Sequence, residues 1–205
     1  MQDSEKNKII KRYEDRVKRY GPSIEALATG GSIKQAERYE LLSSISNLNN
    51  SKILDLGCGL GDFYKWLLSK KINHIEYTGY DITPSFIKEA TIKYPDANFE
   101  VRDIEKDGIP YGKYDYIFSS QVFNNKFEED SNLKVMKKIM SILYKNCNKG
   151  IAMDMMSQCV DFTEPHLYYY NPIEIFSHAM SLTKNIKIFH NFPNFQMTIF
   201  LYKQK

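Results

Sequence analysis

Three glycines at alternate positions follow a short apolar segment and precede a segment of helix-forming residues. They are Gly57, Gly59 and Gly61, and Asp55 stands two residues before the first of them. Such a turn at the carboxyl end of a strand exposes bare backbone, against which a flat adenosine-type ligand can lie. Asp81 follows about 20 residues later, where a carboxylate can accept hydrogen bonds from both hydroxyls of a ribose. These residues predict a site for a nucleoside cofactor.

The elements that must position this site alternate along the chain. Apolar segments bounded by turn residues predict strands, and the segments between them have helical spacing. Alternating strands and helices form a parallel sheet with helices on both faces. Ser32 and Gln35 have the spacing of a capping box, which predicts a further helix up to about residue 47. The strands are expected at about 52–56, 75–80, 97–102, 114–120 and 149–155, and the helices between them at about 61–71, 84–94 and 129–146.

The last part of the chain departs from this alternation. A helix is expected near 172–183, and two strand-like segments at 186–190 and 195–202 flank a turn rich in asparagine. This arrangement is typical of a hairpin, so the last strand is expected to enter the sheet antiparallel. The predicted fold is therefore α/β, with a doubly wound, mostly parallel seven-stranded sheet and helices on both faces.

The first residues are expected to form a helical cap on this core. An amphipathic helix is predicted over residues 3–20, and it can close over the site as a lid. No linker, internal repeat or low-complexity segment divides the chain. We therefore expect a single domain over residues 1–205, in which 1–31 form the cap or lid and 32–205 form the core.

Four features stand in order along the chain. The glycine turn comes first, Tyr80-Asp81 ends the second strand, residues 101–104 end the third, and residues 114–120 form the fourth. In this order the chain resembles the class I, Rossmann-like S-adenosylmethionine-dependent methyltransferases, over roughly residues 32–155. A dinucleotide fingerprint would read Gly-x-Gly-x-x-Gly, whereas here the third glycine comes one residue earlier. The resemblance implies S-adenosylmethionine as the cofactor and a small, bacterial-type, stand-alone catalytic domain.

The resemblance also implies roles for residues around the adenosine. Asp81 would accept hydrogen bonds from both ribose hydroxyls, and Ile82 would offer an apolar wall to the adenine. Asp103 would accept from the adenine amino group, while the backbone amide of Ile104 would meet a ring nitrogen. An aspartate at the end of a strand is also a common loop cap, so Asp103 has a second interpretation.

Other residues would hold the methionine part of the cofactor. Asp55 would anchor the ammonium group, directly or through water, and the glycines would let the backbone approach the ligand. Ser119 stands where the fourth strand ends, beneath the reacting sulfur. Arg38 could reach the cofactor carboxylate, although a solvent salt bridge explains it equally well. Gln35 is interpreted as a capping residue rather than as a ligand contact.

The methyl acceptor is expected over the carboxyl ends of the fourth and fifth strands. After the fourth strand, Gln121 and Asn124 could hold an acceptor, with an ordinary turn as the alternative. After the fifth, Tyr168 and Tyr169 could line its pocket or form the packing edge of a lid. His166 is a candidate general base, which is needed mainly when a hydroxyl must lose its proton.

Composition limits the class of protein. With 205 residues, 42% of them hydrophobic, the chain can build one good core. It has no apolar run of about 18 residues, so membrane insertion is not expected, and its first residues do not form a signal peptide. The three cysteines are odd in number and form no Cys-x-x-Cys pair, which indicates neither a disulfide framework nor a zinc site. We expect a cytoplasmic protein without a metal ion.

The location of charge bears on the partner. The net charge is +3, and residues 1–20 hold seven basic and four acidic side chains, so the remainder is neutral. A nucleic-acid partner is therefore not expected, although the basic arm leaves open an attraction to an anionic substrate or surface. The prediction is methyl transfer to an O or N acceptor on a small molecule. The alternatives are an RNA or protein methyltransferase, a non-catalytic adenosylmethionine-binding accessory protein and an NAD-dependent reductase; the oligomeric state is left open.

Overall fold

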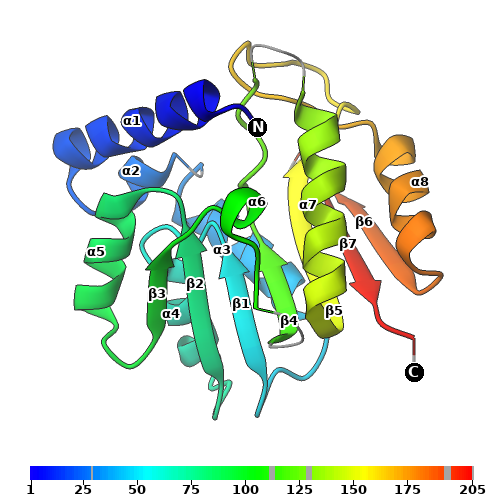
Figure 1. Ribbon diagram of the computed structural model, residues 1–205, viewed down its shortest axis with the longest axis horizontal. Helices are drawn as coiled ribbons and strands as arrows, with labels where there is room; N and C mark the ends of the chain where they lie inside the picture. Colours follow the sequence, from blue (N-terminus) through cyan, green and yellow to red (C-terminus); the bar gives the residue numbers. More distant parts are fainter. Residues whose placement is uncertain (29, 111–113, 128–130, 192–194, 205) are drawn as a thin grey trace.

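A seven-stranded sheet forms the centre of the protein (Figure 1). The computed structural model describes residues 1–28, 30–110, 114–127, 131–191 and 195–204. The strand order is β3-β2-β1-β4-β5-β7-β6. The first five strands pair in parallel, and β7 lies antiparallel between β5 and β6. The strands are β1 (Lys52–Leu56), β2 (Glu76–Asp81), β3 (Asn98–Val101), β4 (Tyr114–Ser119), β5 (Cys147–Met156), β6 (Ile186–Asn191) and β7 (Gln196–Tyr202).

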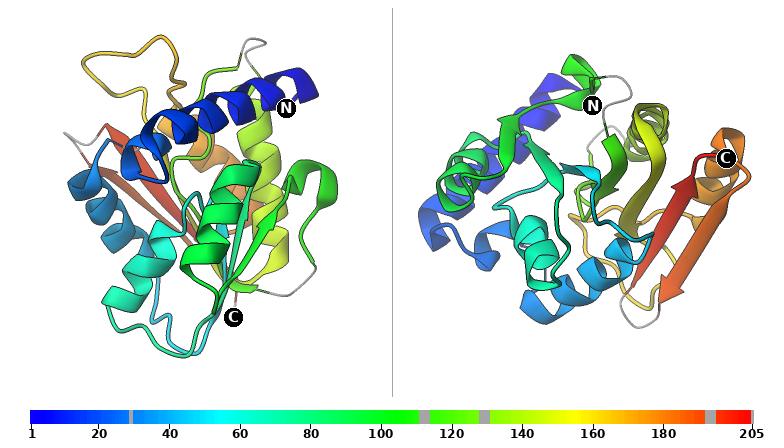
Figure 2. Two further views of the ribbon diagram at one scale, coloured as in Figure 1. Left: turned by 90° about the vertical axis from the view of Figure 1, so that its left-hand side faces the viewer. Right: turned by 90° about the horizontal axis from the view of Figure 1, so that it is seen from below.

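Helices cover both faces of the sheet (Figure 2). Buried side chains of α7 and α8 form the core on one face, and those of α3, α4 and α5 form the core on the other. Among the described residues, no helix is both long enough and apolar enough to cross a membrane. The helices are α1 (Asp3–Tyr20), α2 (Ile24–Leu27), α3 (Ser32–Ser43), α4 (Asp62–Ser69), α5 (Pro84–Lys93), α6 (Ile104–Asp107), α7 (Asn132–Asn146) and α8 (Pro172–Leu182).

The strand before the glycine turn shows why the sheet is buried on both sides. Successive side chains of a strand point to opposite faces. Leu54 and Leu56 join the core beneath α7, whereas Ile53 joins the core beneath α4. Ile53 and Leu54 are completely buried. A strand that is apolar on both sides belongs in the middle of a parallel sheet, and β1 lies between β2 and β4.

The α/β fold, the seven strands and the antiparallel last strand are confirmed, but details of the helices differ. The predicted capping box is wrong: Gly31 is the N-cap of α3, no side chain caps it, and the Gln35 amide donates to the Gly31 carbonyl. The helix ends at Ser43 rather than near residue 47. The short helices α2 and α6 were not predicted. The expected start of α7 at 129 and part of the hairpin turn (192–194) lie outside the described residues.

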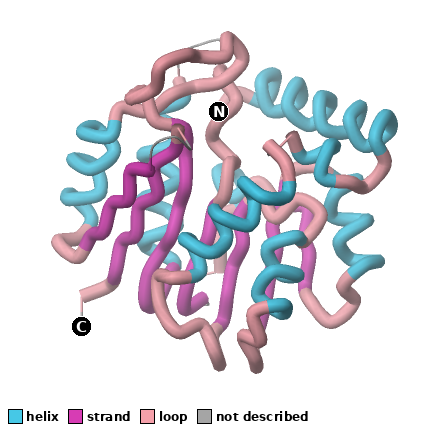
Figure 3. The backbone as a smooth tube through the Cα atoms, turned by 180° about the vertical axis from the view of Figure 1, so that it is seen from behind, coloured by secondary structure: helices cyan, strands magenta, loops and turns pink. Residues whose placement is uncertain are grey.

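Helix α1 lies across the carboxyl ends of the parallel strands (Figures 1 and 3). Its apolar stripe packs against α2 and α5: Tyr13 and Val17 join a small cluster built on Ala26, Leu60 and Phe86. The helix ends at Gly21, which has a φ of +67°. This packing places the N-terminal segment above the glycine turn.

Candidate cofactor and acceptor site

The glycine turn is tied to the end of β2. The amides of Gly57 and Cys58 both donate to the Tyr80 carbonyl, at 2.7 and 3.1 Å. Gly57 and Gly59 have φ of +74° and +53°, values that favour glycine. A Cβ on Gly57 would lie 2.1 Å from Cγ2 of Val122, and one on Gly59 would lie 2.7 Å from Leu27. Side chains from other segments therefore occupy the space in which a Cβ of Gly57 or Gly59 would lie.

Gly61 has a different role from the one predicted. It is the N-cap of α4, with a φ of +79°. A Cβ there would lie 2.9 Å from Tyr94 and 3.1 Å from Phe99, and Gly61 does not line the cavity described below. Gly61 thus allows close packing between helix and sheet, and its predicted contact with a ligand stays a prediction.

Asp81 has the position that the sequence predicts, at the carboxyl end of β2. Its Oδ1 accepts from the Thr83 amide at 2.8 Å, and its Oδ2 accepts from the Gly59 amide at 3.1 Å. Burial raises the pKa of Asp81, and its hydrogen bonds with Thr83 and Gly59 oppose that rise. These amides fix the orientation of the carboxylate at the edge of the cavity described below.

A cavity of about 160 Å³ opens beside this carboxylate. Its floor is the glycine turn with Asp81, and its roof is α1. Its other walls combine apolar side chains with polar and charged ones, among them Arg102, Asp103 and Glu105. The lining includes Gly57, Gly59, Asp81, Ile82, Phe86, Ile104 and Val122, with Ile9 and Tyr13 from α1 above them.

Asp103 lines the cavity, but both of its oxygens already have partners. Oδ1 accepts from the Glu105 amide at 3.0 Å, which makes Asp103 the N-cap of α6. Oδ2 pairs with the ammonium group of Lys6 on α1. The structure therefore places Asp103 in the loop-cap position that the sequence offered as its second interpretation. Ile82 and Ile104 line the same cavity.

Three predicted contacts to the methionine part lie behind the cavity wall. Asp55 is buried and does not line the cavity; it accepts from the Tyr77 hydroxyl at 2.5 Å. Burial raises the pKa of Asp55 to about 7, and nearby carboxylates add to the rise. Ser119 is fully buried, and its hydroxyl has no partner among the described residues. Arg38 is 7% exposed and does not line the cavity.

Asp154, in β5, organises the segment that follows β4 and was missed by the sequence analysis. It is fully buried and accepts from the Ser120 hydroxyl at 2.6 Å and from the Gln121 amide and side chain, both at 2.8 Å. Gln121 has a φ of +61°, which these bonds stabilise. Burial raises the pKa of Asp154, and the charge of Arg38 opposes the rise. A single acid inside an apolar strand was the signal that could have revealed it.

The side chains predicted to bind the acceptor have structural partners. Gln121 lines the cavity, but its side chain bonds Asp154 and accepts from Asn124 at 2.7 Å. Asn124 is buried off the cavity and accepts from the Met156 amide at 3.0 Å. Tyr168 and Tyr169 do not line the cavity either.

The two tyrosines contact neighbours in their own segment. Tyr168 packs edge-on against Tyr170, and the hydroxyl of Tyr169 accepts from the Glu164 amide at 2.9 Å. His166 is exposed and lines a second, more open cavity, to which Ile9 of α1 also belongs. Among the described residues, no group of three or more His, Cys, Asp or Glu side chains is placed to hold a metal ion.

A family model described as a methyltransferase domain matches residues 47–185. The chain belongs to this methyltransferase family. The match includes the glycine turn, Asp81 and Asp154. The sequence prediction of an adenosylmethionine-dependent methyltransferase is therefore confirmed at the level of the family.

Several known proteins are similar to this methyltransferase in sequence or in structure. A non-reducing polyketide synthase of Emericella nidulans is 38% identical over 121 residues, which are 56% of this chain but 4% of the synthase. The chain thus spans a small fraction of that relative. Among solved structures, a TehB-like SAM-dependent methyltransferase from Corynebacterium glutamicum matches with a TM-score of 0.64 and 18% identity, covering 94% of this chain and 98% of the other. Magnesium protoporphyrin IX methyltransferase from Synechocystis PCC 6803 gives a TM-score of 0.65 and 13% identity, covering 84% of each chain. These likenesses show a shared fold.

The cavity of the methyltransferase suits an adenosine group on its own chemistry. Asp81 offers oriented acceptor oxygens, and Ile82, Phe86 and Ile104 offer apolar surface on the same cavity. Gly57 and Gly59 present backbone without side chains. A polar group that fixes one end of a ligand and an apolar wall that covers a flat ring are the usual parts of a small-molecule site.

Proposed function

We propose that this methyltransferase binds S-adenosylmethionine in the cavity under α1 and transfers its methyl group to an oxygen or nitrogen of a small molecule. The position of Asp81 carries the proposal: its carboxylate is held by the amides of Gly59 and Thr83 at the edge of an apolar cavity. In this arrangement Asp81 binds the ribose hydroxyls, while Ile82 and Ile104 flank the adenine. The similar Synechocystis enzyme, whose structure contains SAH, supports this proposal.

The sulfonium supplies an activated methyl group, so the protein contributes mainly position and exclusion of water. Buried Asp154 holds Ser120 and Gln121 beside Gly57, which bonds the end of β2. Oriented groups in a closed cavity lower the barrier to an in-line displacement. His166 stays the candidate base for a hydroxyl acceptor because it lies on the cavity next to this one.

A small acceptor fits the space that α1 leaves. Ile9 and Tyr13 roof the cofactor cavity, so a bulky acceptor cannot approach from that side. We therefore propose that residues 1–31 are a cap on a single catalytic domain. The cytoplasm is the proposed compartment, because the cysteines of the described residues are all free.

Calorimetry with S-adenosylmethionine, S-adenosylhomocysteine and NAD tests the cofactor first. We expect the two sulfur ligands to bind and NAD not to bind. NAD binding without S-adenosylhomocysteine binding would overturn the proposal. An acceptor screen that measures S-adenosylhomocysteine release then tests catalysis. Cofactor binding without turnover on any acceptor would instead support an accessory protein.

A further inference from the structure

A second cavity adjoins the cofactor cavity and has a different chemical character. It has a volume of about 400 Å³ and is open to solvent. Ile9, Asn125 and Phe127 line both cavities, so the two are separated by a single layer of side chains. A molecule in the second cavity therefore lies beside the cofactor cavity. The remaining lining residues are Lys8, Arg12, Lys126, Pro165 and His166.

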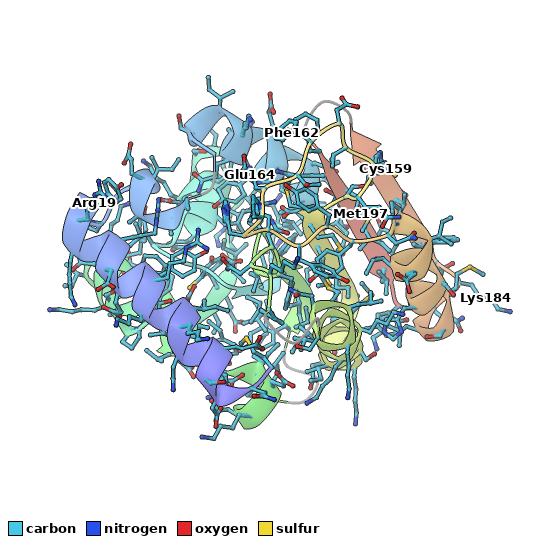
Figure 4. All side chains as sticks on the ribbon, turned by 90° about the horizontal axis from the view of Figure 1, so that it is seen from above. Arg19, Cys159, Phe162, Glu164, Lys184 and Met197 are labelled. Carbon is cyan, nitrogen blue, oxygen red and sulfur yellow. The ribbon has the colours of Figure 1, made fainter. Side chains whose placement is uncertain are left out.

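Basic side chains from three segments gather at this cavity. Arg12 comes from α1, Lys126 from the segment after β4, and His166 from the segment after β5. No ion pair joins Arg12, Lys126 or His166 to an acid among the described residues. Figure 4 shows the segment that carries Glu164 crossing the same edge of the sheet as α1. Basic side chains that converge on a cavity favour an anionic ligand.

Backbone pairing joins the segments that carry Lys126 and His166. The Lys126 amide donates to the His166 carbonyl at 3.0 Å, and Asn125 forms a β-bridge with Leu167, so the two segments are joined side by side. Nη1 of Arg12 donates to Asn125 Oδ1 at 2.8 Å. This bond leaves the other guanidinium nitrogens of Arg12 for a ligand, and a guanidinium fork matches the oxygens of a carboxylate or phosphate.

Asn125 fixes the boundary between the two cavities. Its carbonyl accepts from Asn132 at 2.7 Å, and its side-chain amide approaches the Tyr13 hydroxyl at 3.4 Å. Phe127 beside it is buried and apolar. An acceptor held at the basic end would therefore pass apolar surface before it reaches the cofactor.

We propose that the second cavity is an oxyanion subsite for the methyl acceptor, which is a small molecule with a carboxylate or phosphate group. The proposal rests on the function proposed above. Arg12 and Lys126 bind the oxyanion, His166 lies beside it, and the apolar stretch at Ile9 and Phe127 packs against the body of the acceptor. The anionic group directs the remainder of the molecule toward the transferred methyl group.

The test uses the full chain saturated with S-adenosylhomocysteine and three small probes. Phenyl phosphate, benzoate and benzyl alcohol are titrated by calorimetry or by ligand-observed NMR. We expect at least one anion to bind about tenfold more tightly than the neutral alcohol, which is the effect of one charge-assisted hydrogen bond. Comparing phenyl phosphate with benzoate tells phosphate from carboxylate recognition.

Variants then locate the binding. Arg12→Gln combined with Lys126→Gln should weaken the preferred anion at least about tenfold. Arg19→Gln, at the other end of α1 (Figure 4), is the matched control and should leave anion binding unchanged. Both proteins should bind S-adenosylhomocysteine like the wild type, which shows that they are folded.

The outcomes separate the two proposals. If S-adenosylhomocysteine binds but no anion is preferred, or if the double variant binds the anion like the wild type, the oxyanion subsite is wrong and the proposed function stands. If S-adenosylhomocysteine does not bind to the wild type, the proposed function fails as well. A short single-stranded RNA that binds more tightly than every small anion, through Arg12 and Lys126, would replace the small-molecule proposal with an RNA acceptor.

Discussion

Asp81→Asn tests the cofactor site most directly. The substitution keeps the shape of the side chain but removes its charge and turns one acceptor oxygen into a donor. In the protein, Asp81 already accepts from Thr83 and Gly59 at 2.8 and 3.1 Å, so one of these amides would face an NH₂ group. We therefore expect a loss of stability of about 1–3 kcal/mol from one unsatisfied amide.

The expected loss of cofactor affinity is separate from this loss of stability. A hydrogen bond to a charged group contributes about 1.5–3 kcal/mol, and Asp81 is proposed to make two with the ribose. Losing even one lowers affinity for S-adenosylhomocysteine by about tenfold or more. Calorimetry measures this dissociation constant, and circular dichroism confirms the fold. Asp62 lies nearby but does not line the cavity, so the Asp62→Asn variant should bind S-adenosylhomocysteine as tightly as the wild type.

A ligand without the ribose 2′-hydroxyl distinguishes direct contact from indirect ordering of the turn. If Asp81 binds that hydroxyl, the losses from Asp81→Asn and from 2′-deoxy-S-adenosylhomocysteine must be less than additive, because each removes the same bond. Full additivity, or an unchanged dissociation constant in the folded variant, would refute the assigned role of Asp81.

Three further substitutions test other parts of the site. Gly57→Ala should lower stability by about 1–2 kcal/mol from backbone strain alone, and further because the new Cβ clashes with Val122. It should also weaken cofactor binding. Chemical denaturation measures the loss of stability, and calorimetry measures the loss of affinity. Asp154→Ala should cost roughly 1–3 kcal/mol in urea unfolding, because it removes the acceptor of the Ser120 hydroxyl and the Gln121 amide. Burial raises the pKa of Asp55 to about 7, so between about pH 4 and 7 the folded protein holds a proton that the unfolded chain releases. The stability of the folded protein therefore falls as pH rises through this range. Asp55→Asn should reduce that fall, which thermal melts at several pH values measure.

Each of these predictions has its own check. Gly108 also has a positive φ, but nothing lies within 4 Å of an added Cβ, so Gly108→Ala should show the strain alone. Adding Val122→Ala should partly rescue Gly57→Ala, and an absence of rescue would contradict the clash. A urea midpoint of Asp154→Ala equal to that of the wild type would contradict the role of its buried network. An Asp55→Asn protein with the pH dependence of the wild type would show that the slope arises elsewhere.

The fold could be predicted because its signals are local. The apolar segment before Gly57 is typical of a buried strand, and the glycine turn after it indicates where a helix begins. The details that failed depend on tertiary contacts. Gln35 looks like a capping residue in sequence, but its side chain is buried under packing that the spacing does not reveal. Asp154 is visible as a single acid in an apolar strand, but its partners lie more than 30 residues away in the chain, so local spacing does not reveal what it holds.

The residues of the candidate site also fall into those that local sequence reveals and those that depend on tertiary contacts. Asp81 was found because it follows a strand at a characteristic distance, and the structure places it on the cavity. Asp55 was singled out because it stands two residues before the first glycine, yet its carboxylate is buried and accepts from the Tyr77 hydroxyl. Alternation along a strand tells which residues share a face, but not which face a ligand meets. The basic cavity involves three separate segments, so no single motif could predict it.

The place of β7 in the sheet has a consequence for how the protein is made. This strand is synthesised after its neighbours β5 and β6, yet it lies between them. Until residues 196–202 have left the ribosome, β5 has an unpaired edge, and the completely buried Ile199 and Leu201 are missing from the core. The sheet of the nascent chain therefore stays open until β7 is added, and a truncation before β7 would divide the sheet rather than shorten it.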